Sequence, residues 1–259
     1  MSIENSLRFP DAWTHNKDYA NRYQTSEQIS EVIGHLELYK ANTLLDVGCG
    51  NGAFALSAAK QFPQCQIIAV DPLESAIEEC KSRISQTALT NVSVKHASIE
   101  SLPFDDACID RVLIRNVIHH LESIDLALEE ASRTLLPKGL IVIEAPCNLG
   151  NQSLGQLLSD VYFLMDDSHR RHYFHPKSVS LILQKCNVSV RSTIMWRCLS
   201  QMSSQAVSLI NQHKMGDQLK LHENKSGHCT IELNFMRIIG QKTAVDLPLS
   251  GDNIISSMR

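Results

Sequence analysis

The sequence lacks the charge pattern of a nucleic-acid binder and the cysteine pattern of a metal or disulfide scaffold. Its 24 Lys and Arg residues are outnumbered by 28 Asp and Glu, which gives a net charge of −4 and an isoelectric point near 6.2. No overall basic field therefore attracts nucleic acid or an anionic membrane. The eight cysteines are scattered without a C-x-x-C pair or zinc-type spacing, which indicates reduced thiols and no metal site.

Long apolar runs are also absent. The first 23 residues have no apolar signal core, and no segment approaches the ~20 apolar residues that span a bilayer. With 259 residues, 43% of them hydrophobic, the chain is long enough for one large domain. We therefore expect a cytoplasmic protein, monomeric or homodimeric, whose partner is a small molecule rather than nucleic acid or a membrane.

What the sequence does contain is an alternation of short apolar runs with amphipathic stretches, which is typical of βαβ units and predicts a mostly parallel sheet. A helix is predicted over 25–40, opened by a Thr25 and Gln28 capping box, and Ser123 is expected to cap a helix over 124–136. Between residues 43 and 146 five strands are predicted: "TLLDV", "QIIAVD", "VSVKHA", "IDRVLIRN" and "LIVIEAP". After a helix that begins near Pro176, further strands are predicted at "VSVRSTIMW" and "CTIELNFMRIIG".

The pattern changes after Pro146, where periodicity weakens and aromatic, acidic and basic residues mix. We expect a single domain made of five consecutive parts: N-terminal cap helices (1–40), a ligand-binding core (41–146), a lid or insertion (147–175), the C-terminal part of the sheet (176–242) and a loose tail (243–259).

A glycine-rich loop follows the first predicted strand, in "LLDVGCGNGAF". Read as a dinucleotide fingerprint, Gly48-x-Gly50-x-x-Ala53 fits, with Asp71 at the distance expected for a ribose contact. Asp46 argues against that interpretation, because a carboxylate there would repel a pyrophosphate and attract an ammonium group. The loop therefore favours a zwitterionic ligand such as S-adenosylmethionine (SAM), which has an ammonium, a sulfonium and a ribose diol.

Taken together, the motifs resemble those of class I SAM-dependent methyltransferases, in their small-molecule branch. "LLDVGCGNGAF" and "IIAVDPLESAIEECKSR" are similar to the first two motifs, "ASIESLPFDDACIDRVLIRNVIHHL" and "ALEEASRTLLPKGLIVIE" to the adenine loop and the fourth and fifth strands, and "RRHYFHPKSVSLILQKCNV" to a later helix-entry segment. The resemblance covers roughly residues 41–195. It implies a Rossmann-like doubly wound α/β fold, with a mostly parallel seven-stranded sheet, an antiparallel last strand and a lid insertion after strand 5.

The resemblance also implies a reaction: methyl transfer from SAM to a small-molecule O, N or C nucleophile, with S-adenosylhomocysteine (SAH) as the product. The implied cofactor contacts are Asp46, Gly48, Gly50, Asp71, Pro72, Leu73, Ser98, Ile99, Arg115 and Asn116, and two tyrosines that either close over the cofactor or pack on the first helix, Tyr19 and Tyr23. Ser98 stands where the family usually has an Asp that accepts from the adenine amino group. A neutral hydroxyl accepts more weakly, by roughly 1 kcal/mol.

Methyl transfer is an in-line displacement that needs alignment, and a base only when the nucleophile carries a proton. The catalytic candidates after strand 4 and on strand 5 are His119, His120 and Glu144. Each has a structural alternative: the two histidines can cap the next helix, and Glu144 can orient a lid arginine such as Arg170 or Arg171. The candidates for contact with the acceptor are Cys147, Tyr162, His172, Tyr173 and His175.

Two other functions remain open. An NAD(P)-dependent oxidoreductase is disfavoured by Asp46 and by the lack of a recognisable Tyr-x-x-x-Lys pair. A non-catalytic regulatory or partner protein of the SAM-binding fold is favoured only by Ser98. Nucleic-acid methylation is disfavoured by "RNVIHH", which stands where such enzymes have an Asn/Asp-Pro-Pro-Tyr/Phe motif.

Overall fold

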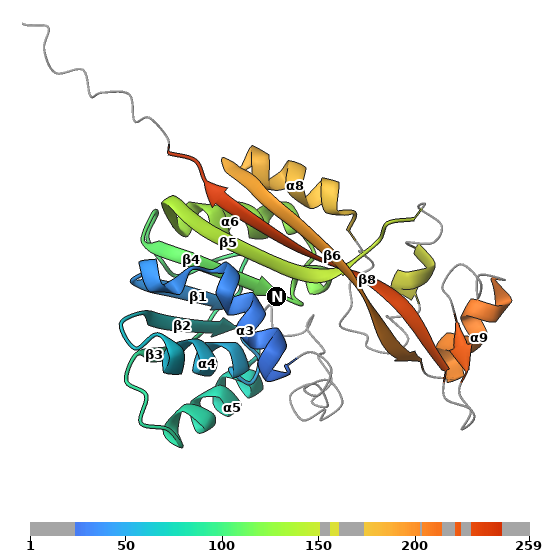
Figure 1. Cartoon of the computed structure of the whole chain (residues 1–259), viewed down its shortest axis with the longest axis horizontal. Helices are drawn as coiled ribbons and strands as arrows, with labels where there is room; N and C mark the ends of the chain where they lie inside the picture. The colour runs from blue at the N-terminus through green and yellow to red at the C-terminus, as the bar shows by residue number, and fades with distance from the viewer. Residues whose placement is uncertain are drawn as a thin grey trace, which may run out of the picture.

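The computed structural model describes residues 24–150, 156–160, 174–202, 204–213, 221–223 and 229–244. Its centre is one sheet in the order β3-β2-β1-β4-β5-β8-β6, with the short β7 beside β8 (Figure 1). Strands β1 to β5 are parallel, whereas β8 runs antiparallel to both β5 and β6. The strands are β1 Thr43–Val47, β2 Gln66–Asp71, β3 Val92–His96, β4 Ile109–Arg115, β5 Leu135–Cys147, β6 Val188–Met202, β7 His222–Glu223 and β8 Cys229–Lys242.

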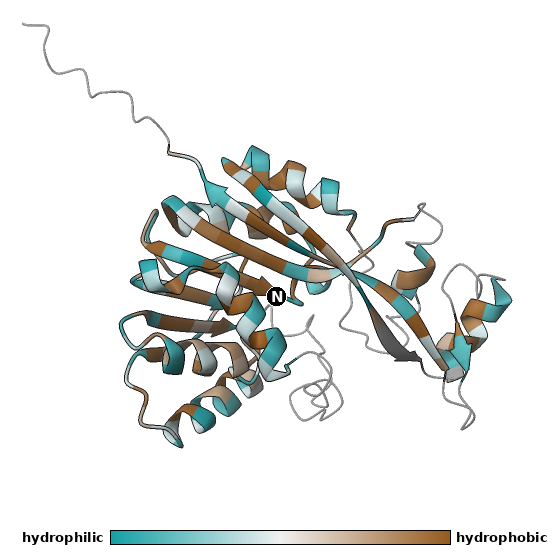
Figure 2. Cartoon of the chain, in the orientation of Figure 1, coloured by the Kyte–Doolittle hydropathy of each residue, from teal (hydrophilic) through white to brown (hydrophobic). Residues whose placement is uncertain are grey.

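Helices cover both faces of the sheet, as expected for a doubly wound fold. Leu44 of β1 packs in a core with α3 and α4, while Leu45, its neighbour in sequence, packs in another with α6 and α8. Figure 2 shows apolar residues along the central strands and hydrophilic residues on the outer sides of the helices. The helices are α3 Ser26–His35, α4 Ala53–Gln61, α5 Glu74–Ser85, α6 Ile124–Thr134, α8 Pro176–Lys185 and α9 Ser204–Gln212, with short 3₁₀ helices η2 Leu38–Lys40 and η3 Ile118–His120.

The helix-start signals are confirmed. The Thr25 hydroxyl accepts from the N–H of Gln28 in a complete capping box, the Ser123 hydroxyl accepts from the N–H of Leu126, and Pro176 opens α8.

Two predicted helix ends are wrong. The helix predicted over 25–40 stops at His35, because Glu37 takes a left-handed conformation that lets Leu36 and Leu38, on either side of it, both be buried. The helix after Ser123 stops at Thr134, because Leu135 pairs with Ile109 and begins β5. In both places long-range burial or pairing overrides local helical periodicity.

The sheet extends beyond β5 as an arm formed by β6 and β8, with β7 paired to β8 at its tip (Figure 1). The pairing of β5 with β8 ends at Cys147 opposite Asn234, whereas β6 and β8 stay paired as far as Met202 opposite Cys229. We use "arm" for Cys198–Met202 and Cys229–Leu233 together with the helical residues 156–160 and α9. Its own apolar cluster includes Leu157, Leu158, Met202, Ala206, Ile210, Ile231, Leu233 and Phe235.

The predicted lid and tail are described only in part. Of the lid, residues 147–150, 156–160 and 174–175 are described, and Cys147 is still part of β5. Of the tail, only 243 and 244 are described. Between β6 and β8 the structure describes α9 and the two residues of β7. Among the described helices, none has the length and apolar character needed to cross a membrane.

Candidate cofactor site

The glycine loop links β1 to α4 and leaves an open place in its middle. Gly48, Gly50 and Gly52 have φ angles of +66°, +51° and +76°, which side-chain-bearing residues rarely adopt. A Cβ on Gly48 would lie 2.2 Å from Cγ2 of Val117, and one on Gly52 would lie 2.4 Å from Sγ of Cys80. Among the described residues, no heavy atom lies within 4 Å of a Cβ placed on Gly50. The loop is therefore packed at both ends and has room for a ligand against Gly50.

Asp71, the last residue of β2, ties this loop to the next one. One carboxylate oxygen accepts from the N–H of Gly50 at 2.9 Å and the other from the N–H of Leu73 at 3.0 Å. Burial raises the pKa of Asp71, and these two hydrogen bonds oppose the rise. Because each carboxylate oxygen can accept more than one hydrogen bond, Asp71 is fixed in place and still able to accept from a ribose diol.

Asp46, near the end of β1, is buried with one oxygen unsatisfied. The residue is 3% exposed, and its Oδ2 has no hydrogen-bond partner among the described residues. Burial raises the pKa of Asp46 to about 7, although the Arg115 guanidinium opposes the rise. A buried polar atom without a partner is costly. A ligand ammonium group would satisfy this oxygen and favour the ionised form, so the residues present fit the methionine end of SAM.

The predicted adenine loop, residues 97–108, starts beside Asp71. The N–H of Ala97 donates to the carbonyl of Asp71 at 3.0 Å, and the loop then turns at Ser98. The Ser98 hydroxyl accepts from the N–H of Glu100 at 3.3 Å, and the backbone carbonyl of Ser98 accepts from the N–H of Ser101 at 3.2 Å. Ile99 is buried at this turn. Ser98 thus shapes the loop in addition to any contact it makes with a base.

A line of buried charges crosses three neighbouring strands, and we call it the charged ladder. Arg115 of β4, Glu144 of β5 and Arg237 of β8 are register partners, and all three are buried. Arg115 Nε donates to Glu144 Oε1 at 2.8 Å, and Arg237 Nε donates to Glu144 Oε2 at 2.8 Å. Arg237 also pairs with Glu31 of α3 at 2.7 Å. Both Glu144 oxygens are thus held by arginines, which favours an anchoring role over that of a base.

The ladder changes what was expected of Glu144. The partners expected from the sequence, Arg170 and Arg171, lie outside the described residues. Arg237 was missed because it stands 93 positions from Glu144, and only the pairing of β5 with β8 brings the two together.

The residues after β4 bring the two candidate histidines close to the end of the sheet. Asn116 has a φ of +54°, and its N–H donates to the Glu144 carbonyl at 2.8 Å. His119 and His120 follow in η3, with ring centroids 4.1 Å apart and planes tilted by 46°. His119 is buried and His120 is partly exposed. The two histidines thus lie just beyond the carboxyl end of β4, the neighbour of β1 in the sheet. Open α/β sheets bind their ligands at this edge.

The acceptor candidates are only partly described. His175 is the N-cap of α8, where its Nδ1 accepts from the N–H of Lys177 at 3.1 Å. Cys147 ends β5 in the core, and burial raises the pKa of its thiol to about 12. The acceptor candidates Tyr162, His172 and Tyr173 lie outside the described residues, and so do the two tyrosines expected near the cofactor, Tyr19 and Tyr23. Within the described ranges, no group of three or more His, Cys, Asp or Glu side chains is placed to hold a metal ion.

Comparisons with known proteins give one consistent result. A family model described as a methyltransferase domain matches residues 38–206. The uncharacterized methyltransferase YcgJ of Bacillus subtilis is 26% identical over 149 residues, 58% of each chain. The (S)-coclaurine N-methyltransferase of Papaver somniferum is 29% identical over 123 residues, 45% of this chain and 35% of the relative. The matched regions thus span less than two thirds of these two relatives.

Solved structures show the same fold over most of the chain. The crystal structure of Bacillus subtilis YcgJ superposes with a TM-score of 0.76 at 20% identity, covering 85% of this chain and 99% of YcgJ. A geranyl diphosphate C-methyltransferase from Streptomyces coelicolor, solved with Mg²⁺, geranyl diphosphate and SAH, gives 0.62 at 14% identity, covering 84% and 77%. The predicted doubly wound α/β fold is confirmed, but in the described part of the chain the sheet has eight strands where seven were expected, because the two-residue β7 also pairs with β8.

Proposed function

This chain belongs to the methyltransferase-domain family, and from that premise we propose that it transfers a methyl group from SAM to a small-molecule acceptor. SAM is the cofactor of this class, and a geranyl diphosphate methyltransferase of similar fold was solved in complex with it. When bound, SAM supplies a methyl group on a positively charged sulfur. Everything else in the reaction is binding, alignment, exclusion of water and, for a protonated nucleophile, removal of a proton.

The observation that carries the proposal is the unsatisfied Oδ2 of buried Asp46 beside an open glycine loop. On this proposal Asp46 binds the ammonium of SAM, Gly50 gives room for its methionine part, and Asp71 accepts from the ribose hydroxyls. The adenine base lies against Ile99 and Ser98. A dinucleotide would instead place a pyrophosphate against Asp46, where like charges repel.

We propose an apolar acceptor with an O, N or C nucleophile. Support comes from the arm, whose apolar cluster extends the sheet beyond the end of β5, and from the stacking of Trp196 on Phe235 at 5.6 Å between centroids. Two methyltransferases similar to this chain are named for substrates with large hydrocarbon parts, coclaurine and geranyl diphosphate.

His119 and His120 are the proposed groups for taking a proton from the acceptor. Their place directly after β4 supports this role, since unperturbed histidines titrate near neutral pH. If one of them is the base, its replacement by Ala lowers kcat by roughly 100-fold and leaves the affinity for SAH unchanged. If both single variants kept the activity of wild type, neither histidine would be the base, and alignment alone would drive the reaction.

The test of the main proposal is calorimetric titration of the protein with SAM, SAH and NAD, followed by transfer from methyl-tritiated SAM to a panel of phenols, amines and prenyl compounds. The proposal is supported if the protein binds SAM and SAH, does not bind NAD, and transfers the methyl group to a member of the panel. NAD binding alone would identify an oxidoreductase.

The second candidate is a non-catalytic regulatory or partner protein of the same fold, favoured by Ser98 in place of the usual Asp. It predicts weak or absent SAM binding in the same titration and no methyl transfer to any compound of the panel.

A further inference from the structure

We propose that Arg133 and Glu130, on the outer helix α6, are positioning residues for the adenine half of the cofactor. They hold the backbone of the loop that carries Ser98 and Ile99, and they do so without reaching the cofactor themselves. This inference rests on the proposed function, because it assigns a role within the same SAM site.

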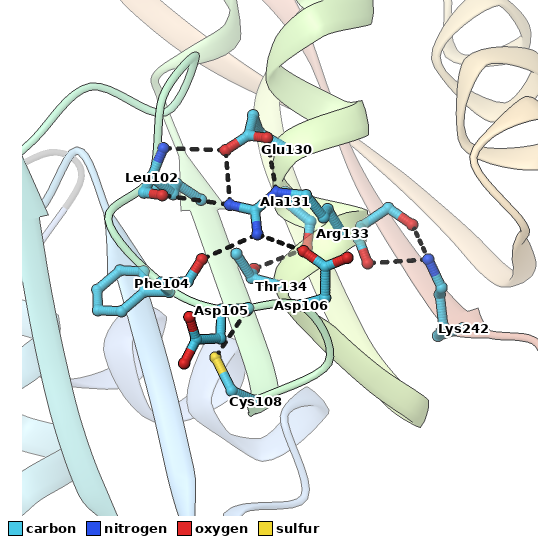
Figure 3. A network of polar contacts seen from close by, with 11 residues as sticks. Leu102, Phe104, Asp105, Asp106, Cys108, Glu130, Ala131, Arg133, Thr134 and Lys242 are labelled. Carbon is cyan, nitrogen blue, oxygen red and sulfur yellow. Dashed lines mark hydrogen bonds and ion pairs between the residues drawn. The ribbon is translucent and has the colours of Figure 1, made fainter.

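The two side chains first bind each other and so form one rigid unit on α6. Arg133 Nε donates to Glu130 Oε1 at 2.8 Å, and Arg133 Nη2 donates to Glu130 Oε2 at 2.9 Å (Figure 3). A bidentate pair of this kind fixes the plane of the guanidinium and is stronger than a neutral hydrogen bond. The remaining donors and acceptors of the pair are thereby aimed in defined directions.

The remaining donors and acceptors of Arg133 and Glu130 form hydrogen bonds with the backbone of the loop. Glu130 Oε2 also accepts from the N–H of Leu102 at 3.0 Å, and Arg133 Nη2 donates to the carbonyl of the same residue at 3.2 Å. Arg133 Nη1 donates to the carbonyl of Phe104 at 2.8 Å. Figure 3 shows these bonds converging on the guanidinium from one side of α6. Because the contacts are to backbone atoms, they specify the path of the loop whatever its side chains.

Backbone hydrogen bonds also fix the two ends of the loop, at Ala97 and at Ala107. The N–H of Ala97 donates to the carbonyl of Asp71, and beyond Phe104 the N–H of Ala107 donates to the carbonyl of Arg133 at 2.9 Å. Ile99 and Leu102 are buried in the core beneath. Ser98 and Ile99 therefore lie in a short span between two fixed points, one at the ribose side and one at α6.

Such a span matters most where the ligand contacts are weak. Ser98 offers a neutral oxygen, which already accepts from Glu100, and the other adenine contact expected from the resemblance is the backbone N–H of Ile99. A loop that is ordered before binding spares the ligand the entropy cost of ordering it. The Arg133 and Glu130 pair supplies that order.

Burial alone does not explain the pair. Arg133 and Glu130 keep 30% and 23% of their side-chain surface exposed, so their main connections are the hydrogen bonds just described. Arg133 also bonds Asp106 at 2.7 Å, but this carboxylate is 79% exposed. Asp106 therefore provides a matched control that removes one bond of the same guanidinium without releasing the backbone of Leu102.

The experiment measures binding of SAH and of 5′-methylthioadenosine, which contains only the adenosine half, to wild type, Arg133→Gln, Glu130→Ala, Glu130→Gln and Asp106→Ala. We expect Arg133→Gln and Glu130→Ala to weaken both ligands by the same factor, roughly tenfold, since the lost order is shared. Glu130→Gln keeps an oxygen for the N–H of Leu102 and should recover part of the loss. Asp106→Ala should bind like wild type.

Amide hydrogen exchange of residues 98–104, measured without ligand, gives a second readout. Faster exchange there in Arg133→Gln, with exchange in β1 and β4 unchanged, is the expected result. Variants that melt at lower temperature but bind both ligands like wild type would overturn the positioning role. Absence of SAH binding by wild type would instead contradict the proposed function, so the two failures are distinguishable.

Discussion

The edge of the sheet around Asp46 and the arm are held together in different ways. At the edge, short loops are connected by hydrogen bonds to the Asp71 carboxylate and to backbone groups, within residues 46–73 and the loop at 97–108. In the arm, apolar side chains from three distant segments form a cluster, with Leu158, Ile210 and Ile231 among its members. The contrast teaches that the site proposed for the cofactor is built from local motifs, whereas the region proposed for the acceptor depends on long-range packing.

The charged ladder joins the two regions. Arg115 packs its guanidinium over the Phe54 ring of α4 at 4.6 Å, while Arg237 lies 5.1 Å from the ring of Trp196, on the strand that leads into the arm. Glu144 is bound to both arginines. Four substitutions separate the contributions of the edge, the ladder and the arm.

Cutting the ladder should have the largest effect. Glu144→Ala leaves two buried guanidinium groups without their shared carboxylate, so the free energy of unfolding should fall by about 3–5 kcal/mol. Urea denaturation measures this loss. As a control, Arg197→Ala removes an exposed pair with Glu232 and should change stability by less than about 1 kcal/mol. Similar midpoints for the two variants would contradict the role of the ladder.

Asp46→Asn should alter the pH dependence of both stability and binding. The folded-state pKa of Asp46 is raised to about 7, so above its unfolded value near 4 the folded protein binds more protons than the unfolded chain. Without ligand, wild-type stability should therefore fall as pH rises from 4 to 7, by up to about 4 kcal/mol relative to the Asn variant.

The same substitution tests the cofactor contact. SAM affinity of wild type should rise with pH through about 7, as Asp46 ionises opposite the ligand ammonium. Asp46→Asn should bind SAM at least roughly tenfold more weakly at pH 8 and without this pH dependence. Undiminished affinity would contradict the assignment of Asp46.

Ile231→Ala probes the arm alone. Ile231 is fully buried in the arm cluster, and its truncation should cost about 2–4 kcal/mol. Because the cluster shares no described hydrogen bond with the glycine loop, SAH affinity should stay within about twofold, well under 1 kcal/mol. Titration calorimetry of the folded variant measures its SAH affinity, and thermal unfolding of the same preparation measures its stability. A parallel loss of SAH affinity would show that arm and edge form one cooperative unit.

Gly50→Ala should have the smallest effect on stability and a clear one on binding. Its Cβ would have no heavy atom of the described residues within 4 Å, so the expected cost is the strain of a positive φ, about 1 kcal/mol. The new methyl group enters the space proposed for SAM and should weaken SAH binding. Gly52→Ala is the matched comparison: its Cβ meets Sγ of Cys80 at 2.4 Å, so it should lose more stability. Equal SAH affinity of Gly50→Ala and wild type would remove Gly50 from the site.

The edge could be predicted from sequence because its determinants are local. The bounds of β1 and β2 match the predicted "TLLDV" and "QIIAVD", and the glycines of the loop adopt the left-handed conformations that only glycine takes readily. The helix caps at Thr25 and Ser123 likewise depend on residues three positions apart.

What could not be predicted depends on contacts between distant residues. The sequence pattern marks Arg133 only as part of a helix, and nothing local indicates that its guanidinium reaches Leu102 and Phe104. The extension of β6 and β8 past β5 is set by their pairing with each other, and the Arg237 partner of Glu144 by strand register.

The shared carboxylate of Asp71 has a consequence for how a ligand would be held. Because this one side chain bonds the turn at Gly50 and the turn at Leu73, any movement of it shifts both loops together. A molecule that engages Asp71 through its sugar therefore also adjusts the wall against its amino-acid end. The two ends of such a molecule would not contribute independently, and two separate fragments would be expected to bind cooperatively.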